Sequence, residues 1–283
     1  MTRLPTFFLS HGGGPWPYMM DEPDTRARFA RMYAALQAIP PSLPERPKAV
    51  LVVSGHWEEA EFTVGTSAAP GMVFDYYGFP EHTYRIKYAA PGSPEVAQRV
   101  VDLGRQAGIV VRTDAERGFD HGTFSMLQPM YPDADVPVVQ LAMKANMDPA
   151  QHFALGKALA PLRDEGVLIL GSGQSYHNLR RWNTSGRQAS IAFDGWLRDV
   201  LLRRTGVERE RALEHWEEAP SARVAHPREE HLIPLMVVAG AAAEEPATVV
   251  YGEDFFGALH VSSFRFGSDT TATGFDDLGV SAR

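Results

Sequence analysis

The chain has 283 residues, of which 44% are hydrophobic and 22% are charged, as in an ordinary globular protein. Its formal net charge of −8 argues against nucleic acid or an anionic membrane as the main partner. There is no cysteine, which excludes disulfide scaffolds, thiolate metal sites and cysteine nucleophiles. No apolar run approaches the about 20 residues that cross a bilayer, and the apolar stretch at the N-terminus is too short for a signal peptide. We therefore expect a cytoplasmic protein.

Short apolar runs alternate with amphipathic stretches along the chain. The runs lack period-2 alternation, which indicates strands covered on both faces. They occupy 4–10, 49–55, 136–143, 166–173 and 247–252. The amphipathic stretches have helical spacing and occupy 25–39, 93–108, 148–166 and 189–206. Ser93 and Asp148 are each followed by a proline, which is typical of an N-cap residue and the first helical position after it. Gly108 and Gly166 stand where these two helices should end.

This alternation predicts an α/β fold, in which a single domain has a central, largely parallel or mixed sheet flanked by helices on both faces. The proline- and aromatic-rich segment 58–92 is expected to form a long loop or hairpin over one edge of the sheet. We assign residues 1–267 to one domain. Residues 268–283 are polar and show no periodicity, so we expect a flexible tail.

Three histidines follow separate predicted strands. His11 and His56 come directly after the first two strands, and His177 comes shortly after the fourth. In an open α/β sheet, ligands bind outside the carboxyl ends of the strands. If these strands are parallel, the three imidazoles share one rim. Because imidazole is the commonest transition-metal ligand, we predict a shared metal site there.

A fourth histidine, His231, precedes an apolar run that predicts a helix. We expect the first turn of this helix to carry Glu229, Glu230 and His231 and to point toward the same rim. Separately, His121 follows Asp120 in a predicted loop. It is either a turn residue that caps the next helix or an acid–base group that faces substrate.

The remaining histidines lack such a setting. We expect His82, His152, His215 and His260 to be surface or structural residues, while His226 is ambiguous because it lies before Pro227 in the segment leading to His231.

A histidine-rich open site supports more than one chemistry. Zinc can activate water to hydrolyse an amide or ester, with Glu230 or His177 as the base. Iron(II) can keep positions open for a catechol and dioxygen, and a histidine that titrates near neutrality can then serve as base and acid. A non-catalytic protein that binds a metal or an aromatic compound is a third alternative. Composition alone does not decide among them.

Six segments spread over nearly the whole chain carry a family resemblance. They are FFLSHGGGPWP (7–17), VVSGHWE (52–58), YAAPGSPEVAQRV (88–100), GFDHGTFSMLQPMYPDADVPVVQL (118–141), LGSGQSYHNL (170–179) and HPREEHLIPLMVVAGAA (226–242). In this order they resemble the class III extradiol ring-cleavage dioxygenases, in particular the 4,5-DOPA dioxygenase-like branch. The resemblance implies that 1–267 is a catalytic domain that inserts both atoms of O2 into a catechol-type, DOPA-like substrate.

The resemblance also implies a mononuclear non-haem Fe(II) site. The ligands that it implies are His11, His56 and His231. It places His177 next to the metal, as a base or an extra ligand, and it makes His121 a second active-site histidine that contacts substrate or oxygen. A related branch uses two histidines and a glutamate, so Glu230 is the alternative third ligand. Zinc can also occupy such a site in the isolated protein.

Three aromatic residues neighbour these histidines in the sequence. Trp16, Trp57 and Tyr176 are expected to form an aromatic wall that contacts substrate. The expected partners are a small catechol and O2, with no nucleic acid and no membrane, and the chain is expected to be a monomer or a small homo-oligomer.

Overall fold

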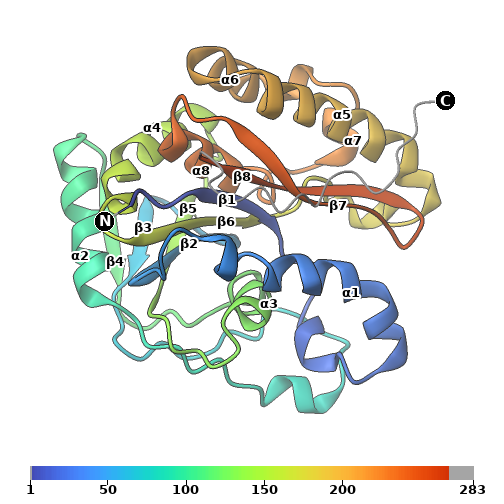
Figure 1. The fold of residues 1–283 in the computed structure, drawn as a ribbon, viewed down its shortest axis with the longest axis horizontal. Coiled ribbons are helices and arrows are strands. Elements are labelled where there is room, and N and C mark those ends of the chain that lie inside the picture. Colours follow the sequence, from blue (N-terminus) through green and yellow to red (C-terminus); the bar gives the residue numbers. More distant parts are fainter. Residues whose placement is uncertain (1, 268–283) are drawn as a thin grey trace.

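The computed structural model describes residues 2–267, and within them eight strands form one mixed sheet. The strands are β1 (Thr6–Ser10), β2 (Ala49–Glu59), β3 (Phe62–Gly65), β4 (Val111–Asp114), β5 (Val138–Lys144), β6 (Val167–Gly173), β7 (Ala247–Phe255) and β8 (Leu259–Phe266). Their spatial order is β4-β3-β5-β2-β6-β1-β8-β7 (Figure 1). The central strands β5, β2, β6 and β1 are parallel, and β8 and β7 add an antiparallel hairpin at one side. The predicted α/β class and mixed sheet are confirmed. The predicted flexible tail, 268–283, lies outside the described residues.

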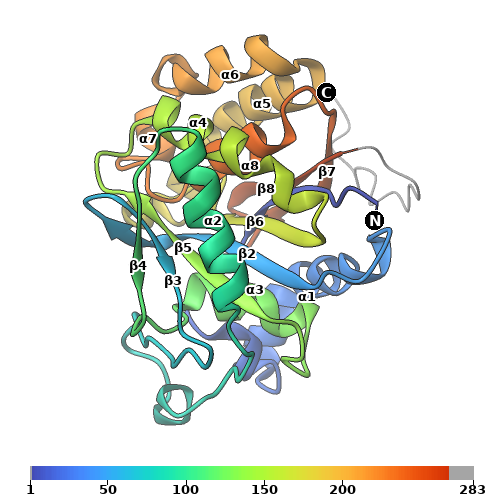
Figure 2. The ribbon, with the colours of Figure 1, turned by 90° about the vertical axis from the view of Figure 1, so that its left-hand side faces the viewer.

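The helices cover both faces of this sheet. They are α1 (Pro23–Gln37), α2 (Pro94–Gln106), α3 (His121–Met130), α4 (Pro149–Leu159), α5 (Arg187–Arg203), α6 (Gly206–Glu214), α7 (Ala222–Ala225) and α8 (Pro234–Ala242). Short 3-10 turns are η1 (Trp16–Met19), η2 (Pro40–Ser42), η3 (Glu81–Tyr84), η4 (Ala160–Arg163), η5 (Leu179–Arg181), η6 (Thr184–Gly186) and η7 (Trp216–Glu218). Helices α4, α5 and α8 lie on one face, with α6 outside them, and α1 and α3 lie on the other (Figures 1 and 2).

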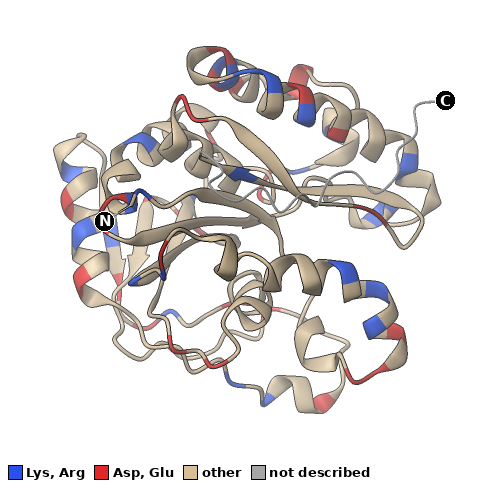
Figure 3. Ribbon diagram, viewed as in Figure 1, with Lys and Arg blue, Asp and Glu red and all other residues tan. Residues whose placement is uncertain are grey.

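The central strands are apolar because both of their faces are covered. Every residue of β1 and β6 is buried, and neither strand carries a charge. Charged side chains gather instead on the outer helices and connecting turns (Figure 3). No helix within residues 2–267 is long and apolar enough to cross a bilayer.

The predicted helix starts are confirmed by their hydrogen bonds. The hydroxyl of Ser93 accepts from the backbone N–H of Val96 at 3.3 Å, and the carboxylate of Asp148 accepts from Ala150 N–H at 2.9 Å. Helix α4 is shorter than expected, since it ends at Leu159 and gives way to η4. Pro161 explains this end, because proline has no N–H to continue the α-helical ladder.

Three strands were not predicted as such. Strand β8 has a weak apolar pattern because it carries buried polar residues, of which Ser263 accepts a hydrogen bond from Ser10 N–H at 2.9 Å. Strand β3 lies inside the segment 58–92, which therefore contributes to the sheet as well as forming a long loop, and the short β4 pairs with it.

Two expectations about the histidines need correction. His56 does not follow its strand, because β2 continues to Glu59; it lies in an irregular stretch where the register with β5 shifts between Val53 and Glu58. Such a bulge redirects side chains away from the regular alternation of a strand. Likewise, Glu230 and His231 lie in a turn before α8 and not in its first turn, since the helix begins at Pro234.

Candidate metal centre and active site

Three histidine side chains converge beside the carboxyl ends of the parallel strands. His11 comes directly after β1, His56 lies in the bulge of β2, and His231 lies in the turn before α8. The Nε2 atom of His56 lies 3.2 Å from Nε2 of His11 and 3.2 Å from Nε2 of His231. One ring nitrogen from each residue therefore faces a common point, and the three nitrogens lie within 4.8 Å of one another. This set could hold one metal ion.

Glycines let the backbones that carry these histidines approach one another. A Cβ atom at Gly173, the last residue of β6, would lie 2.1 Å from the carbonyl oxygen of His231. That same carbonyl accepts a hydrogen bond of 3.0 Å from Gln174 N–H. A Cβ atom at Gly122 would lie 2.9 Å from the His56 ring. Larger residues at these two positions would push His231 and His56 out of place.

The hydrogen bonds of His11 fix which of its nitrogens carries the proton. Its Nδ1 atom lies 2.9 Å from the hydroxyl oxygen of Ser172, and that hydroxyl donates its own proton to the carbonyl of Gly122. Ser172 must therefore accept from His11 Nδ1–H. The lone pair of His11 is then on Nε2, the atom that faces His56, as a metal ligand requires.

Glu230 holds two histidines at once. Its Oε1 atom lies 3.0 Å from Nδ1 of His231 and 3.0 Å from Nδ1 of His177. The two imidazole rings stack, with centroids 3.4 Å apart and planes inclined by 19°. Because the carboxylate accepts a hydrogen bond from each Nδ1–H, both rings keep their Nε2 lone pairs. His177 thus lies directly beside the candidate metal ligand His231.

Asp75 makes the corresponding contacts on the other side of the site. Its Oδ1 atom accepts from His121 Nδ1 at 2.9 Å and from His121 N–H at 3.1 Å, while Oδ2 faces Nδ1 of His56 at 3.4 Å. The rings of His56 and His121 lie 4.0 Å apart. The structure therefore brings together all five histidines predicted for the site. Asp75 was not predicted, although it belongs to the aromatic-rich FDYYGFP stretch of the loop.

Burial keeps the three converging imidazoles neutral. Loss of solvent, followed by the influence of neighbouring histidines, lowers the pKa of His11 and of His231 well below the ordinary value. Burial, with His121 next, lowers the pKa of His56 to about 3. Neutral imidazoles present a lone pair to a metal without first losing a proton.

The two carboxylates, Asp75 and Glu230, are charged, in contrast to the neutral histidines. Burial alone would raise the pKa of Asp75, but the hydrogen bond from His121 and nearby imidazoles outweigh it and lower the pKa below its ordinary value. Burial would also raise the pKa of Glu230, but the hydrogen bond from His177 outweighs it, so the pKa of Glu230 is lowered as well. Both groups are therefore charged acceptors for the histidine N–H groups at neutral pH.

Asp120 anchors the helix that carries His121. It is the N-cap of α3 and accepts from Thr123 N–H at 3.1 Å, so the cap is Asp120 and His121 is the first helical residue. Its buried carboxylate also accepts from Ser54 Oγ at 2.8 Å and from Gln140 and Arg117 side chains. Burial, together with the charge of Asp75, nevertheless raises the pKa of Asp120. These bonds join α3 to β2 and β5 and so fix the distance between His121 and His56.

The three aromatic residues expected to contact substrate are all buried. Trp16 is 1% exposed, stacks on Phe29 and donates to the carbonyl of His11 at 2.8 Å. Trp57 is 3% exposed and donates to Glu59, and Tyr176 is fully buried. Of the three, Trp16 is the one whose hydrogen bond holds the backbone of a site histidine. Contact of these rings with substrate stays a prediction.

Two other rings lie closer to the site histidines and were not predicted. The ring of Trp182 is partly exposed and lies 6.5 Å from that of His177, and the ring of Tyr76 lies 6.1 Å from that of His121. Trp182 follows the LGSGQSYHNL segment, and Tyr76 follows Asp75 in the loop. Their aromatic character was a signal, but the sequence does not show which aromatic rings the fold brings beside the histidines.

His82, His152, His215 and His260 have the structural or surface settings expected of them, and His226, which was ambiguous, is structural. His152 is buried and connects α4 to β5. Its Nδ1 forms a hydrogen bond with Asp148 O at 2.7 Å, and its Nε2 accepts one from Lys144 N–H at 3.1 Å. His226 is also buried and pairs with the carbonyl of Ser175 at 3.1 Å. His260 lies between two aspartates, and His82 and His215 are exposed.

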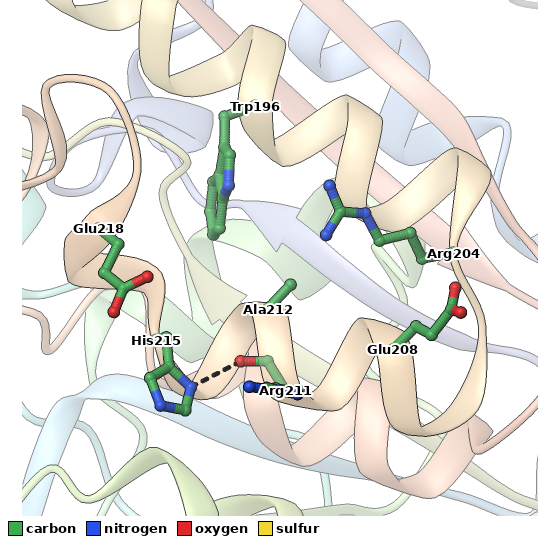
Figure 4. Close-up of a pocket in the computed structure, with 7 residues that line it drawn as sticks. All are labelled: Trp196, Arg204, Glu208, Arg211, Ala212, His215 and Glu218. Atoms are coloured by element: carbon green, nitrogen blue, oxygen red, sulfur yellow. Dashed lines mark hydrogen bonds between the residues drawn. The ribbon is translucent and has the colours of Figure 1, made fainter.

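A pocket of 690 Å³ lies on the outer helices and is lined by none of the site residues (Figure 4). Trp196 and Arg204 line it from the α5 side, and Glu208, Arg211 and Ala212 of α6 face them, with His215 and Glu218 at one end. The Nδ1 atom of His215 is engaged with the carbonyl of Arg211 at 2.9 Å. Within residues 2–267, all three groups of side chains that could hold a metal belong to the histidine cluster. The candidate metal site therefore lies at that cluster.

Known proteins share both the sequence and the fold. The family model described as "Catalytic LigB subunit of aromatic ring-opening dioxygenase" matches residues 5–263. The chain is 38% identical over 269 residues to 4,5-DOPA dioxygenase extradiol of Beta vulgaris, covering 93% of this chain and 96% of that protein. It is 37% identical over 276 residues to the protein of the same name from Escherichia coli (strain K12), covering 94% and 96%. The crystal structure of uncharacterized protein JW3007 from Escherichia coli K12 matches with a TM-score of 0.73 and 33% identity, covering 94% of this chain and all of that chain.

Taken with these matches, the α/β fold and its histidine cluster define an extradiol aromatic ring-opening dioxygenase, an oxidoreductase that acts on a small aromatic molecule with O2. The chain belongs to the family of the catalytic LigB subunit of these enzymes. Membership selects ring opening over the zinc-dependent hydrolase and the non-catalytic binding protein that the sequence had left open.

Proposed function

We propose that this enzyme opens the ring of a DOPA-like catechol at a mononuclear Fe(II) site held by His11, His56 and His231. The observation that carries the proposal is the convergence of three Nε2 atoms whose lone pairs are directed inward by partners at Nδ1. Several relatives are named 4,5-DOPA dioxygenase extradiol, which supports the choice of substrate class. The three imidazoles fit such a metal ion, because two or three imidazole ligands suit both iron(II) and zinc.

The geometry favours His231 over Glu230 as the third ligand. The Nε2 atom of His231 lies 3.2 Å from that of His56, whereas Oε1 of Glu230 is occupied at the opposite edge of the His231 ring. A carboxylate that accepts from the outer nitrogen of a metal-binding histidine orients the ring and raises its basicity. We therefore give Glu230 this supporting role.

Fe(II), if held by His11, His56 and His231, would supply open coordination positions for a catechol and dioxygen. The protein supplies the groups that move protons. His177 donates Nδ1–H to Glu230, which leaves Nε2 free to accept a proton from a catechol hydroxyl. We assign His121 the hydrogen bond to a substrate or dioxygen oxygen, with Asp75 orienting its ring through Nδ1.

An aromatic wall completes the proposed substrate site. Trp182 offers a partly exposed ring beside His177. The rings of Trp16, Trp57 and Tyr176 are buried and are the other proposed members of this wall. Aromatic side chains suit a catechol because they pack against its ring by offset or edge contacts.

The test is anaerobic reconstitution with Fe(II), followed by oxygen uptake on L-DOPA and a panel of other catechols. We expect one O2 consumed for each catechol, a ring-opened semialdehyde that carries both oxygen atoms, and the highest kcat/KM for a DOPA-like member. Zinc-loaded protein is the control and should consume no oxygen. Absence of oxygen uptake with every catechol would contradict the iron site, and ring opening without turnover of L-DOPA would contradict the substrate class.

A further inference from the structure

The five site histidines are held by two carboxylates and one hydroxyl, and the two carboxylates are used in the same way. Glu230 contacts Nδ1 of His231 and Nδ1 of His177. Asp75 contacts Nδ1 of His56 and Nδ1 of His121. Each carboxylate thus joins one proposed metal ligand to one proposed proton-transfer histidine. We infer that Asp75 is a positioning residue, the counterpart of Glu230, and that it sets the tautomer and orientation of His121 and His56 together.

The contacts of Asp75 leave little freedom to His121. Oδ1 accepts from the backbone N–H and from Nδ1 of the same residue, at 3.1 Å and 2.9 Å, so the carboxylate fixes the ring relative to its own backbone. His121 is the first residue of α3, where a negative charge is favoured by the helix dipole. With Nδ1 protonated toward Asp75, Nε2 is the nitrogen left for substrate.

The Asp75 carboxylate also reaches the metal site itself. Oδ2 lies 3.4 Å from Nδ1 of His56, and the same ring directs Nε2 toward His11 and His231. Carboxylates behind metal-binding histidines typically change metal affinity by about 10- to 100-fold when removed. Since Asp75 lies in the loop between β3 and α2, this loop contributes to metal binding without supplying a ligand.

Asp75 can be replaced, and a second carboxylate on the same loop provides a control. Its side chain is 18% exposed, so it is accessible enough to replace without opening a large cavity. On the same loop, Glu81 is 81% exposed and pairs only with Arg85 among the contacts of its carboxylate in residues 2–267. Glu81→Gln is therefore the matched control, since it removes a carboxylate from the same segment without touching a histidine.

The inference rests on the proposed metal site, and its test uses zinc and no catechol, so failure of ring opening does not affect it. We expect Asp75→Ala to lower zinc affinity, measured by competition with a chelator, by about 10- to 100-fold. In zinc-loaded protein with 15N-labelled histidine, the NMR signals of His121 should show the proton on Nδ1 in the parent and its loss from Nδ1 in Asp75→Ala. Asp75→Asn keeps an accepting oxygen, so it should restore the tautomer and part of the affinity.

The result that would overturn the inference is a zinc affinity and a His121 tautomer in Asp75→Ala that match those of Glu81→Gln and the parent. If Asp75→Ala does not fold, the same comparison is made with Asp75→Asn. An Asp75→Asn protein with parental thermal unfolding and reduced zinc affinity supports the positioning role, and unchanged zinc affinity overturns it.

Discussion

The hydroxyl of Ser172 lies 2.9 Å from Nδ1 of His11 and donates to the carbonyl of Gly122, so it accepts a hydrogen bond from His11 Nδ1–H. Ser172 is in β6, and His11 follows the neighbouring strand β1, with which β6 pairs in parallel. A fully buried hydroxyl of the central sheet therefore orients a proposed metal ligand.

Ser172→Ala should weaken both metal binding and the fold. The substitution leaves the buried Nδ1–H of His11 without its acceptor, which costs about 1–3 kcal/mol, and it allows the ring to turn. We expect zinc affinity to fall by about 10-fold. Zinc competition and urea unfolding measure the two effects, with exposed Ser185→Ala as the control. Equal zinc affinities in the two variants would contradict the role of Ser172.

His231→Ala and Glu230→Gln should separate the two candidates for the third metal ligand. Removing a ligand should abolish stoichiometric metal binding, whereas removing an orienting carboxylate should lower affinity by about 10- to 100-fold and leave one metal per chain at saturation. Elemental analysis after dialysis against saturating and limiting zinc gives the number of metal ions per chain and the affinity for zinc. The reverse ranking would make Glu230 the ligand.

Gly173→Ala should disturb both the fold and the metal site. The added Cβ would lie 2.1 Å from the carbonyl of His231, and backbone cannot move away as a flexible side chain can. We expect a loss of about 3 kcal/mol in the free energy of unfolding, as for severe overpacking, together with weaker zinc binding. Gly195→Ala in α5 is the control, because its Cβ meets no atom within 4 Å and should stabilise the helix by up to about 1 kcal/mol. Similar stability of both variants would be inconsistent with this packing.

His260 should make stability depend on pH. Its Nε2 lies 3.1 Å from Asp194 and its Nδ1 lies 3.1 Å from Asp254. The hydrogen bond with Asp194 outweighs burial and raises the pKa of His260 above the ordinary value of 6.5. A raised pKa in the folded state contributes stability that is fully present below 6.5 and is lost as the pH rises through the folded-state pKa.

His260→Asn should therefore be destabilising mainly at lower pH. We expect it to lower the free energy of unfolding by about 2 kcal/mol at about pH 6, where it removes hydrogen bonds to charged partners, and by much less at about pH 9. Urea unfolding of the variant and the parent at both pH values measures the difference, and exposed His82→Asn serves as control. A loss of equal size at both pH values would rule out a charged His260.

Much of the fold follows from local sequence patterns. Buried parallel strands must be apolar on both faces, so the strands β1, β2, β5 and β6 were visible as apolar runs. Strand β8 was not, because its buried polar residues are satisfied by partners such as Ser10, more than 250 positions away in the chain. Hydrogen bonds of that range leave no local periodicity.

The site, like the fold, was predicted from the sequence only in part. The sequence by itself placed His11, His56 and His177 near one rim, because each follows an apolar run that predicts a strand, and the resemblance brought His231 into the metal set. Only the tertiary structure decided that a bulge directs His56 inward, that Glu230 lies behind His231, and that Asp75 joins His121 to His56. The physical reason is that the direction of a lone pair depends on the partner of the other ring nitrogen, and those partners come from strands, turns and loops brought together only when the chain folds.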